Sequence, residues 1–96
     1  MISFPPPVLT TFPLGRVYIT ASALRELPHT DVKNALGRHG WRDWGDVCAE
    51  DRAANEDALR DGSRLVSSYR SRAGVKFWII TEADRSMTTV LLPADY

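Results

Sequence analysis

Residues 75–81 read Val-Lys-Phe-Trp-Ile-Ile-Thr, the most apolar and β-branched run of the chain. Such a run predicts a central strand, here over Val75–Glu82, that is covered on at least one face. Two further β-rich runs lie on either side of it, over Ser63–Arg72 and Met87–Leu92. Short polar breaks separate the three runs, so we expect three consecutive antiparallel strands.

The chain before these strands predicts a short strand followed by helices. Residues 15–20 have the composition of a strand, and the Thr20 hydroxyl can cap a helix over residues 21–27. A second helix is expected from residue 30 to Gly40, because its apolar residues recur at helical spacing. Gly40 is expected to end this helix in the left-handed conformation.

A third helix is expected to begin at Asp46 or Val47 and to end near Asp61. Glu50 and Asp51 fall in its first turn, where negative charge suits the helix dipole. Its apolar stripe is thin, which indicates a surface helix. The expected element order is therefore β-α-α-α-β-β-β. This order describes an α+β domain whose helices cover one face of a three-stranded antiparallel meander.

The first thirteen residues are rich in proline, with Pro5–Pro7 in a row and a return at Pro13. Proline fixes φ and has no amide donor, so we expect an extended arm over residues 1–13 and a single α+β domain over residues 14–96. Two interpretations of the arm remain open. It can bind a partner, or it can be a terminal segment that is packed or frayed.

Length and composition indicate one small domain with no overall electrostatic field. The 96 residues carry 12 basic and 12 acidic side chains, a formal net charge of zero. This balance argues against a role that depends strongly on nucleic acid or on an anionic membrane. No apolar run approaches the length of a membrane span, and the first residues do not read as a secretory signal. We therefore expect a cytoplasmic location.

The side chains that bind metals or act as nucleophiles are few and widely spaced. His29, His39 and the single Cys48 do not have the paired spacing of a zinc site, so each histidine is expected to be a surface or capping residue. Cys48 and His39 could form a nucleophile and base, but no third member is evident, and a buried structural thiol is the favoured interpretation. No metal or cofactor is expected.

Charge is segregated along the second half of the chain. Residues 43–61 are mainly acidic, whereas residues 63–76 carry four basic side chains and no acid. A basic strand near Tyr69 and Trp78 could bind RNA, with bases stacked on the aromatic rings. Alternatively, the acidic helix lies over the basic strands and neutralises them, and the zero net charge favours this interpretation.

The loop Asp84-Arg85-Ser86 joins the last two expected strands and combines an acid, a base and a hydroxyl. At the tip of a hairpin, these three groups could form a partner-binding or catalytic cluster. They could equally form a self-capped turn, in which Asp84 accepts a hydrogen bond from the amide two residues later.

Residues 78–86 read Trp-Ile-Ile-Thr-Glu-Ala-Asp-Arg-Ser, and they continue into Thr88–Pro93 and a terminal Tyr96. Together with residues 43–46, Asp-Trp-Gly-Asp, and the acidic helix, this segment resembles a family of small uncharacterised proteins encoded on plasmids, phages and integrated elements. The resemblance covers most of the chain after Leu14. It implies an accessory role for a mobile element.

A second resemblance is at the level of the fold. A strand leading into residues 20–27, then helices, then three strands, is similar to the RelE-like ribosome-dependent RNase toxins, and the last strands are similar to barnase-like RNases. This likeness implies that four residues bind and polarise a scissile phosphate without a metal. These residues are Arg64, Arg70, Arg85 and Tyr96. Such toxins are usually strongly basic, whereas this chain is neutral.

Two functions are therefore expected from different classes. The first is a non-enzymatic accessory protein that binds a host or defence-system protein, such as an inhibitor of restriction or CRISPR defence. Exposed tryptophans beside charged residues are typical of binding hot spots. The expected contact residues are Trp41, Trp44, Asp46, Glu50, Asp51, Asp84, Arg85 and Ser86. The alternative is a small RelE-like RNase that binds RNA. A homodimer is a separate prediction, based on the arm and on the apolar character of both sheet faces.

Overall fold

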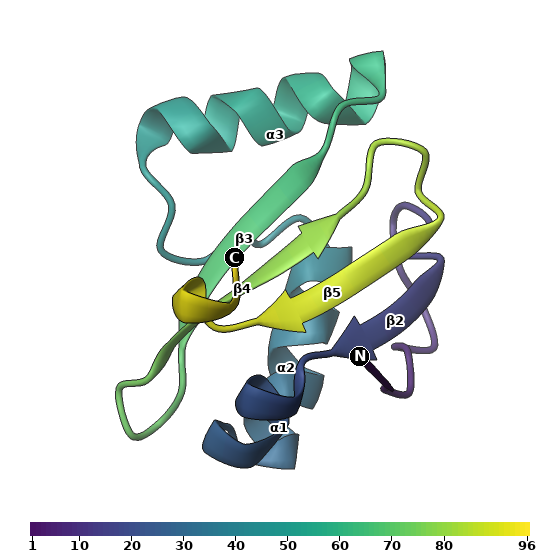
Figure 1. Cartoon of the computed structure of the whole chain (residues 1–96). Coiled ribbons are helices and arrows are strands. Elements are labelled where there is room, and N and C mark those ends of the chain that lie inside the picture. The colour runs from purple at the N-terminus through teal and green to yellow at the C-terminus, as the bar shows by residue number, and fades with distance from the viewer.

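The computed structural model describes all 96 residues and contains three helices and a five-stranded mixed sheet (Figure 1). The predicted α+β class is confirmed. In chain order the elements are β1 (Ile2–Ser3), β2 (Arg16–Ile19), α1 (Ala21–Glu26), α2 (His29–Gly40), α3 (Ala49–Asp61), β3 (Leu65–Arg70), β4 (Lys76–Thr81), β5 (Met87–Leu91) and the 3-10 turn η1 (Pro93–Asp95).

The strand order in the sheet is β1-β2-β5-β4-β3. Strands β3, β4 and β5 form the expected antiparallel meander, and Ile79 in β4 lies opposite Ser67 and Val90 on its two neighbours. The expectation of a purely antiparallel sheet is wrong. Strand β2 runs parallel to β5, with Val17 opposite Thr88, and β1 adds a further antiparallel strand beyond β2.

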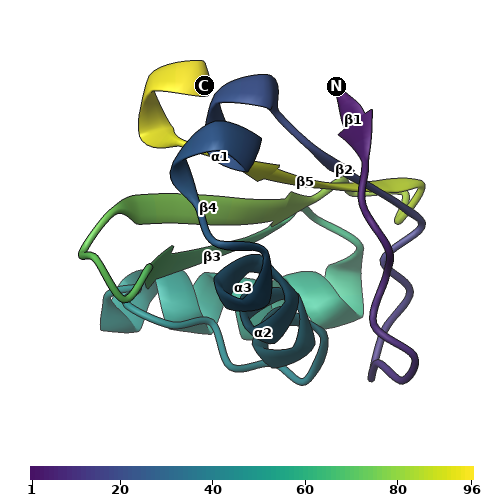
Figure 2. The ribbon, with the colours of Figure 1, turned by 90° about the horizontal axis from the view of Figure 1, so that it is seen from below.

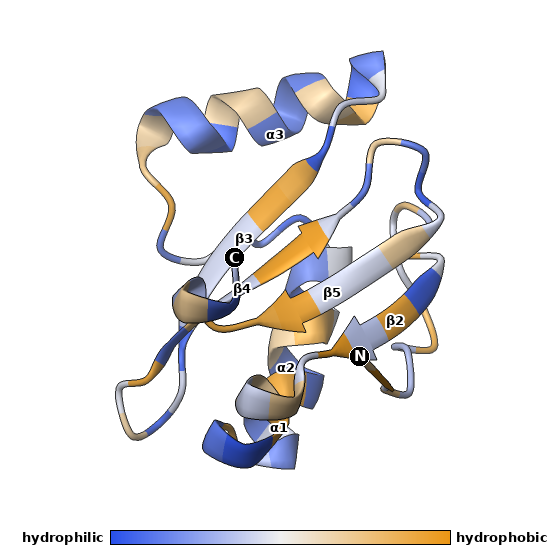
Figure 3. Cartoon of the chain, viewed as in Figure 1, coloured by the Kyte–Doolittle hydropathy of each residue, from blue (hydrophilic) through white to orange (hydrophobic).

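Helix α2 covers one face of the sheet, and η1 and the C-terminus lie on the other side (Figure 2). Helix α3 lies beside the outer edge of β3, where Asn55 pairs with the backbone of Val66. Helix α1 follows β2 and lies at the lower end of the sheet in Figure 1. Figure 3 shows that the middle of the sheet is hydrophobic, whereas α3 is mostly hydrophilic. The only buried residues of α3 are Asn55 and Ala58, as expected for a surface helix.

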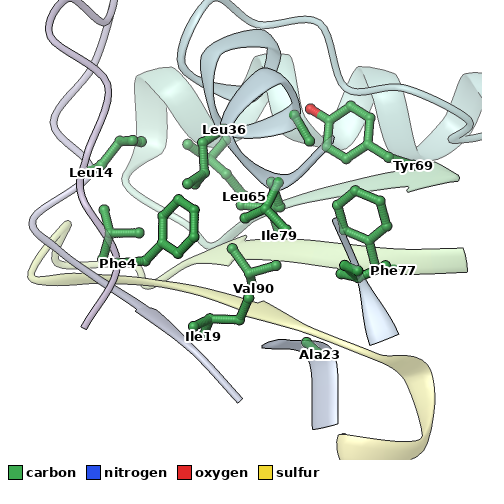
Figure 4. Packing of buried hydrophobic residues seen from close by; sticks show 14 of the residues in the cluster. Phe4, Leu14, Ile19, Ala23, Leu36, Leu65, Tyr69, Phe77, Ile79 and Val90 are labelled. Carbon is green, nitrogen blue, oxygen red and sulfur yellow. The ribbon is translucent and has the colours of Figure 1, made fainter. Parts of the chain in front are cut away.

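The hydrophobic core lies between the sheet and α2 (Figure 4). Alternation along β3 and β4 directs Leu65, Tyr69, Phe77 and Ile79 to this face, and all four are buried. The helical spacing of Val32, Ala35 and Leu36 places them on the face of α2 that meets these strands. Burial of these side chains is the main source of stability.

The helix ends differ from the expected ones at two places. Helix α3 begins at Ala49, after the N-cap Cys48, and not at Asp46 or Val47. The Thr20 hydroxyl accepts a hydrogen bond from the Ala23 amide at 3.2 Å, so the predicted cap of α1 is confirmed. Gly40 does not adopt the left-handed conformation, so that prediction is wrong. A Cβ atom at Gly40 would lie 2.6 Å from Cγ2 of Thr10. Glycine is required there because the arm passes directly over the end of α2.

The proline-rich arm is extended and packed against the rest of the chain. Phe4 and Phe12 are buried and belong to the hydrophobic core, and Ile2–Ser3 forms β1. The Phe4 amide donates to the Val17 carbonyl at 3.0 Å, and the Thr11 amide donates to the Gly40 carbonyl at 2.8 Å. The arm therefore lies along β2 and the end of α2, and it leaves the other face of the sheet open.

A chain of hydrogen bonds crosses the core. His39 Nδ1 lies 2.6 Å from Ser67 Oγ, and His39 Nε2 lies 2.9 Å from Thr81 Oγ1. Thr81 Oγ1 lies 2.8 Å from Thr88 Oγ1, and the Thr88 hydroxyl donates to the Leu14 carbonyl at 2.7 Å. We refer to Ser67, His39, Thr81, Thr88 and the Leu14 carbonyl as the buried polar chain.

The carbonyl at the end of the buried polar chain determines its direction. Because the single hydroxyl proton of Thr88 goes to the Leu14 carbonyl, Thr88 must accept from Thr81. Thr81 in turn must accept from Nε2–H of His39, so Nδ1 is unprotonated and accepts from Ser67. His39 is fully buried and neutral, so the expectation that it is a surface or capping residue is wrong.

The outer edge of β3 is paired although no strand lies beside it. The side-chain amide of Asn55 donates to the Val66 carbonyl at 2.8 Å and accepts from the Val66 amide at 3.1 Å. The Ser68 amide donates to the Trp44 carbonyl at 3.1 Å, and the Asp46 amide donates to the Ser68 carbonyl at 2.7 Å. These contacts fasten α3 and the segment before it to the sheet.

Candidate functional site

The sheet face opposite α2 carries a cleft of about 370 Å³ between α3 and the strands. We call it the open-face cleft. Its charged, aromatic and hydroxyl side chains come from both walls. Asp46 and Asp51 belong to the α3 side, and Arg64, Ser68, Lys76 and Trp78 belong to the β3–β4 side. A second hollow of about 240 Å³ continues from it towards Tyr96.

An aromatic cluster forms the end of the open-face cleft nearest the C-terminus. The rings of Trp78 and Tyr96 meet edge to face, with centroids 5.7 Å apart. Arg64 donates from Nη2 to the Tyr96 hydroxyl at 2.6 Å, and its guanidinium carbon lies 5.6 Å from the ring centroid. Tyr96 is 69% exposed, so the cluster presents its surface to solvent.

Charges of both signs face the open-face cleft without forming an ion pair. The ion pairs of the structure are Arg38–Asp43, Arg60–Asp57 and Arg72–Asp31, none of which belongs to the cleft. The charged groups of Asp46, Asp51, Arg64 and Lys76 are therefore free to pair with a ligand. The Ser68 hydroxyl is buried and has no hydrogen-bond partner, which is rare for a buried polar group.

The two expected tryptophans have different environments. Trp44 is buried, and its indole Nε1 donates to Glu56 at 2.9 Å, so it belongs to the core rather than to a binding surface. Trp41 is 61% exposed, and its Nε1 donates to the Leu9 carbonyl at 3.2 Å. Trp41 therefore lies against the arm. Glu50 is exposed on the first turn of α3 but does not line the open-face cleft.

The loop between β4 and β5 forms the self-capped turn. Asp84 accepts from the Ser86 amide at 3.0 Å, and hydrogen bonding to Ser86 holds the pKa of Asp84 below its usual value. Asp84 and Ser86 are exposed. Their hydrogen bonds stay within the turn, so the turn itself accounts for both residue types.

Arg85 supports the fold from the middle of this loop. Its guanidinium donates to four carbonyls, those of Ala58, Ser63, Glu82 and Ala83, over 2.7–3.3 Å. Ala58 lies in the last turn of α3, and its carbonyl also accepts from the Gly62 amide at 2.9 Å. Arg85 therefore joins the end of α3 to the β4–β5 loop, and both of its terminal nitrogens already donate to carbonyls.

The Arg85→Ala variant is expected to lose about 2–3 kcal/mol of stability, because several carbonyls lose a charged donor at once. Chemical denaturation measures the change. Arg85 has a φ of 60°, a conformation that glycine adopts without strain. The Arg85→Gly variant should therefore be less destabilised than Arg85→Ala. Equal stability of wild type and Arg85→Ala would contradict the structural role.

The four residues of the expected phosphate site do not converge. Arg64 and Tyr96 are in contact, but Arg85 is held by carbonyls, and Arg70 donates to the Gly74 carbonyl at 3.4 Å beyond the other end of β3. The arginines are thus distributed over three places in the fold.

The two histidines and the cysteine do not come together in a metal or nucleophile site. No group of three or more His, Cys, Asp or Glu side chains is placed to hold a metal ion. Cys48 is exposed, so the expectation of a buried thiol is wrong; its sulfur caps α3 by accepting from the Asp51 amide at 3.5 Å. His39 is held by Ser67 and Thr81 in the core, and His29 packs against Phe4 at the surface.

Sequence reasoning did not place Ser68, Lys76 and Trp78 in the same site as Asp46 and Asp51. The alternation along β4 contained part of the signal, because it puts Lys76 and Trp78 on the face opposite Phe77 and Ile79. The missing information was the position of α3. Only the pairing of its segment with the β3 edge brings the acidic residues to this face.

Comparisons of the chain with protein-family models, with curated proteins and with solved structures found no match. The two family resemblances therefore stay predictions. None of the helices has the length and apolar character needed to cross a membrane.

Proposed function

We propose that the protein is a binding module that holds a protein partner on the open-face cleft. The observation that carries this proposal is the contact of Arg64, Trp78 and Tyr96 at a solvent-exposed site. Tryptophan, tyrosine and arginine are the residue types enriched at binding hot spots. The aromatic rings supply contact area at low cost in conformational entropy, because each has two rotatable side-chain bonds.

The charge pattern favours a protein over a nucleic acid as the partner. The α3 wall of the cleft carries Asp46 and Asp51, and Glu50 lies next to them, so a phosphate backbone would be repelled along that side. A protein segment can present a basic side chain to the α3 wall and an acidic one to Arg64 and Lys76. Unpaired charges of this kind contribute mainly to specificity and to the rate of association.

The resemblance to mobile-element proteins supplies a biological setting for this proposal. A plasmid or phage accessory protein that acts by surface contact has its partner in the host cell, for example a restriction or CRISPR component. The proposed partner is therefore a host or defence-system protein, and the proposed action is occlusion of one of its surfaces.

Capture experiments in a bacterial host test the open-face cleft directly. Tagged wild type should retain a specific protein, and the Trp78→Ala and Asp51→Lys variants should each retain at least about tenfold less of it. Asp57→Lys is a matched control, because Asp57 is an exposed acid on the same helix outside the cleft. Quantitative mass spectrometry measures the retained protein. Equal capture by all four proteins would contradict the proposal.

The RNase alternative makes a different prediction in the same host. It requires growth arrest on induction and relief of that arrest by Arg64→Ala, because Arg64 and Tyr96 are the members of the expected phosphate site that are in contact. Arrest that Arg64→Ala relieves, together with cleaved RNA, would replace the binding proposal by the RNase. Normal growth with specific capture supports binding.

A further inference from the structure

A groove of about 650 Å³ runs between the arm and α2, away from the open-face cleft. We call it the arm groove. One wall is the proline-rich segment Pro5–Val8, and the other is the outer surface of α2 from His29 to Arg38. Phe4 is buried at its base and packs against His29, with ring centroids 4.7 Å apart. The arm groove is therefore part of the folded structure and has fixed walls.

Apolar side chains are displayed at one end of the arm groove. Val8 is 97% exposed, Leu9 72% and Trp41 61%. The hydrogen bond from Trp41 Nε1 to the Leu9 carbonyl fastens the indole to the arm. Next to them, both the amide and the hydroxyl of Thr11 donate to the Gly40 carbonyl and join the arm to the end of α2. Exposed apolar patches of this kind commonly mark sites of protein interaction.

Gly37, which has no side chain, lies in the α2 wall of the arm groove. Glycine within a helix is less stable than alanine, so its presence there needs a reason. The packing of the chain supplies none, because a Cβ atom at Gly37 would have no atom within 4 Å, and its φ is not in the left-handed region. The effect of the glycine is to leave the wall of the groove open.

The charged residues that line the arm groove are basic. Lys33 and Arg38 extend from α2, His29 lies beside them, and no acidic side chain lines the groove. Arg38 pairs with Asp43, whereas Lys33 forms no ion pair. The free positive charge beside an apolar surface is complementary to a segment that combines carboxylates with an apolar side chain.

We propose that the arm groove binds an acidic peptide segment of another protein, with an apolar side chain over Gly37 and a carboxylate at Lys33. The prolines of Pro5–Pro7 and the exposed Val8 form the apolar wall against which such a segment packs. This site is separate from the open-face cleft. The protein would then have two docking surfaces and would be able to hold two partners together.

A displayed library of random peptides, panned against the full-length protein, tests the arm groove without an identified ligand. Enriched peptides should carry an aromatic or aliphatic residue flanked by Asp or Glu. The Gly37→Leu variant fills the groove from a position with free space around it, so it should fold normally and lose at least about tenfold in affinity for these peptides. Gly37→Ala is the matched control, because it adds only one methyl group.

The charge-reversal variant Lys33→Glu should show a similar loss, and the Trp78→Ala variant of the open-face cleft should bind the peptides like wild type. Enrichment of peptides without an acidic bias would overturn the proposal, as would peptides that bind Gly37→Leu unchanged or no enrichment at all. A wild-type dimer in light scattering that Gly37→Leu converts to a monomer would identify the occupant as a second copy of the chain, and would also overturn it.

Discussion

Lowering the pH from about 6.5 to about 3 is expected to reduce the free energy of unfolding by about 1.4 kcal/mol per pH unit through His39 alone. Burial lowers the pKa of His39 from 6.5 to about 3, with a further contribution from the charge of Arg85. The total, about 5 kcal/mol, is comparable with the whole stability of a domain of this size. Denaturant titrations at several pH values measure this slope.

The sign of the effect follows from where the proton binds. Between pH 6.5 and pH 3 the unfolded chain takes up a proton on His39 and the folded chain does not, so acid favours unfolding. Asp43 and Asp95 accept hydrogen bonds that lower their pKa values below 3.8, so their contributions are lost only at lower pH. The slope between about pH 6.5 and 4.5 therefore belongs mainly to the imidazole.

The His39→Gln variant provides the control, because an amide can accept from Ser67 and donate to Thr81 but does not titrate. We expect a modest loss of stability at neutral pH and a much flatter dependence between about pH 6.5 and 4.5. An unchanged slope in this variant would show that the effect arises elsewhere in the chain.

The Trp44→Ala variant is expected to lose about 3–5 kcal/mol of stability, because it leaves a large cavity between the arm, α2 and α3. The Trp44 ring lies against His39 and Phe12, with centroid distances of 5.6 and 6.0 Å. For a domain of fewer than about 100 residues, a loss of this size lowers the melting temperature by roughly 15–30 °C. Thermal unfolding followed by circular dichroism measures the change.

Two matched variants test the origin of this loss of stability. One separates the packing of the Trp44 ring from its hydrogen bond, and the other compares Trp44 with a tryptophan at the surface. Trp44→Phe keeps most of the ring and loses the bond to Glu56, so its cost should be about 1–2 kcal/mol. Trp41→Ala removes an exposed ring and should cost less than about 1 kcal/mol. If Trp41→Ala were as destabilising as Trp44→Ala, the different environments of the two rings would be contradicted.

The meander could be predicted from sequence because its information is local. Each of the three runs is rich in β-branched and aromatic residues, and a short polar break joins it to the next. The parallel pairing of β2 with β5 could not be predicted in this way. Two strands and three helices separate these partners, and nothing in Arg16–Ile19 specifies its neighbour.

The roles of single residues in and near the candidate site could not be predicted either, where they depend on contacts between distant parts of the chain. Arg85 stands between an acid and a hydroxyl in an exposed-looking loop, yet its acceptors come from α3, from the segment after it and from its own turn. Gly40 looks like a helix terminator, yet the contact that requires glycine comes from Thr10. In both cases the residue type is explained by a tertiary contact with a residue that is distant in the sequence.

The pairing of Asn55 with both backbone groups of Val66 has a consequence for solubility. A bare edge strand is a template on which another chain can add its own strand, the first step towards fibrous aggregates. At β3, the side-chain amide of Asn55 and the segment from Trp44 to Asp46 form hydrogen bonds with the backbone groups of the edge. At the opposite edge, β1 is only two residues long. Both edges of the sheet therefore offer few free backbone groups to which a strand of another chain could add.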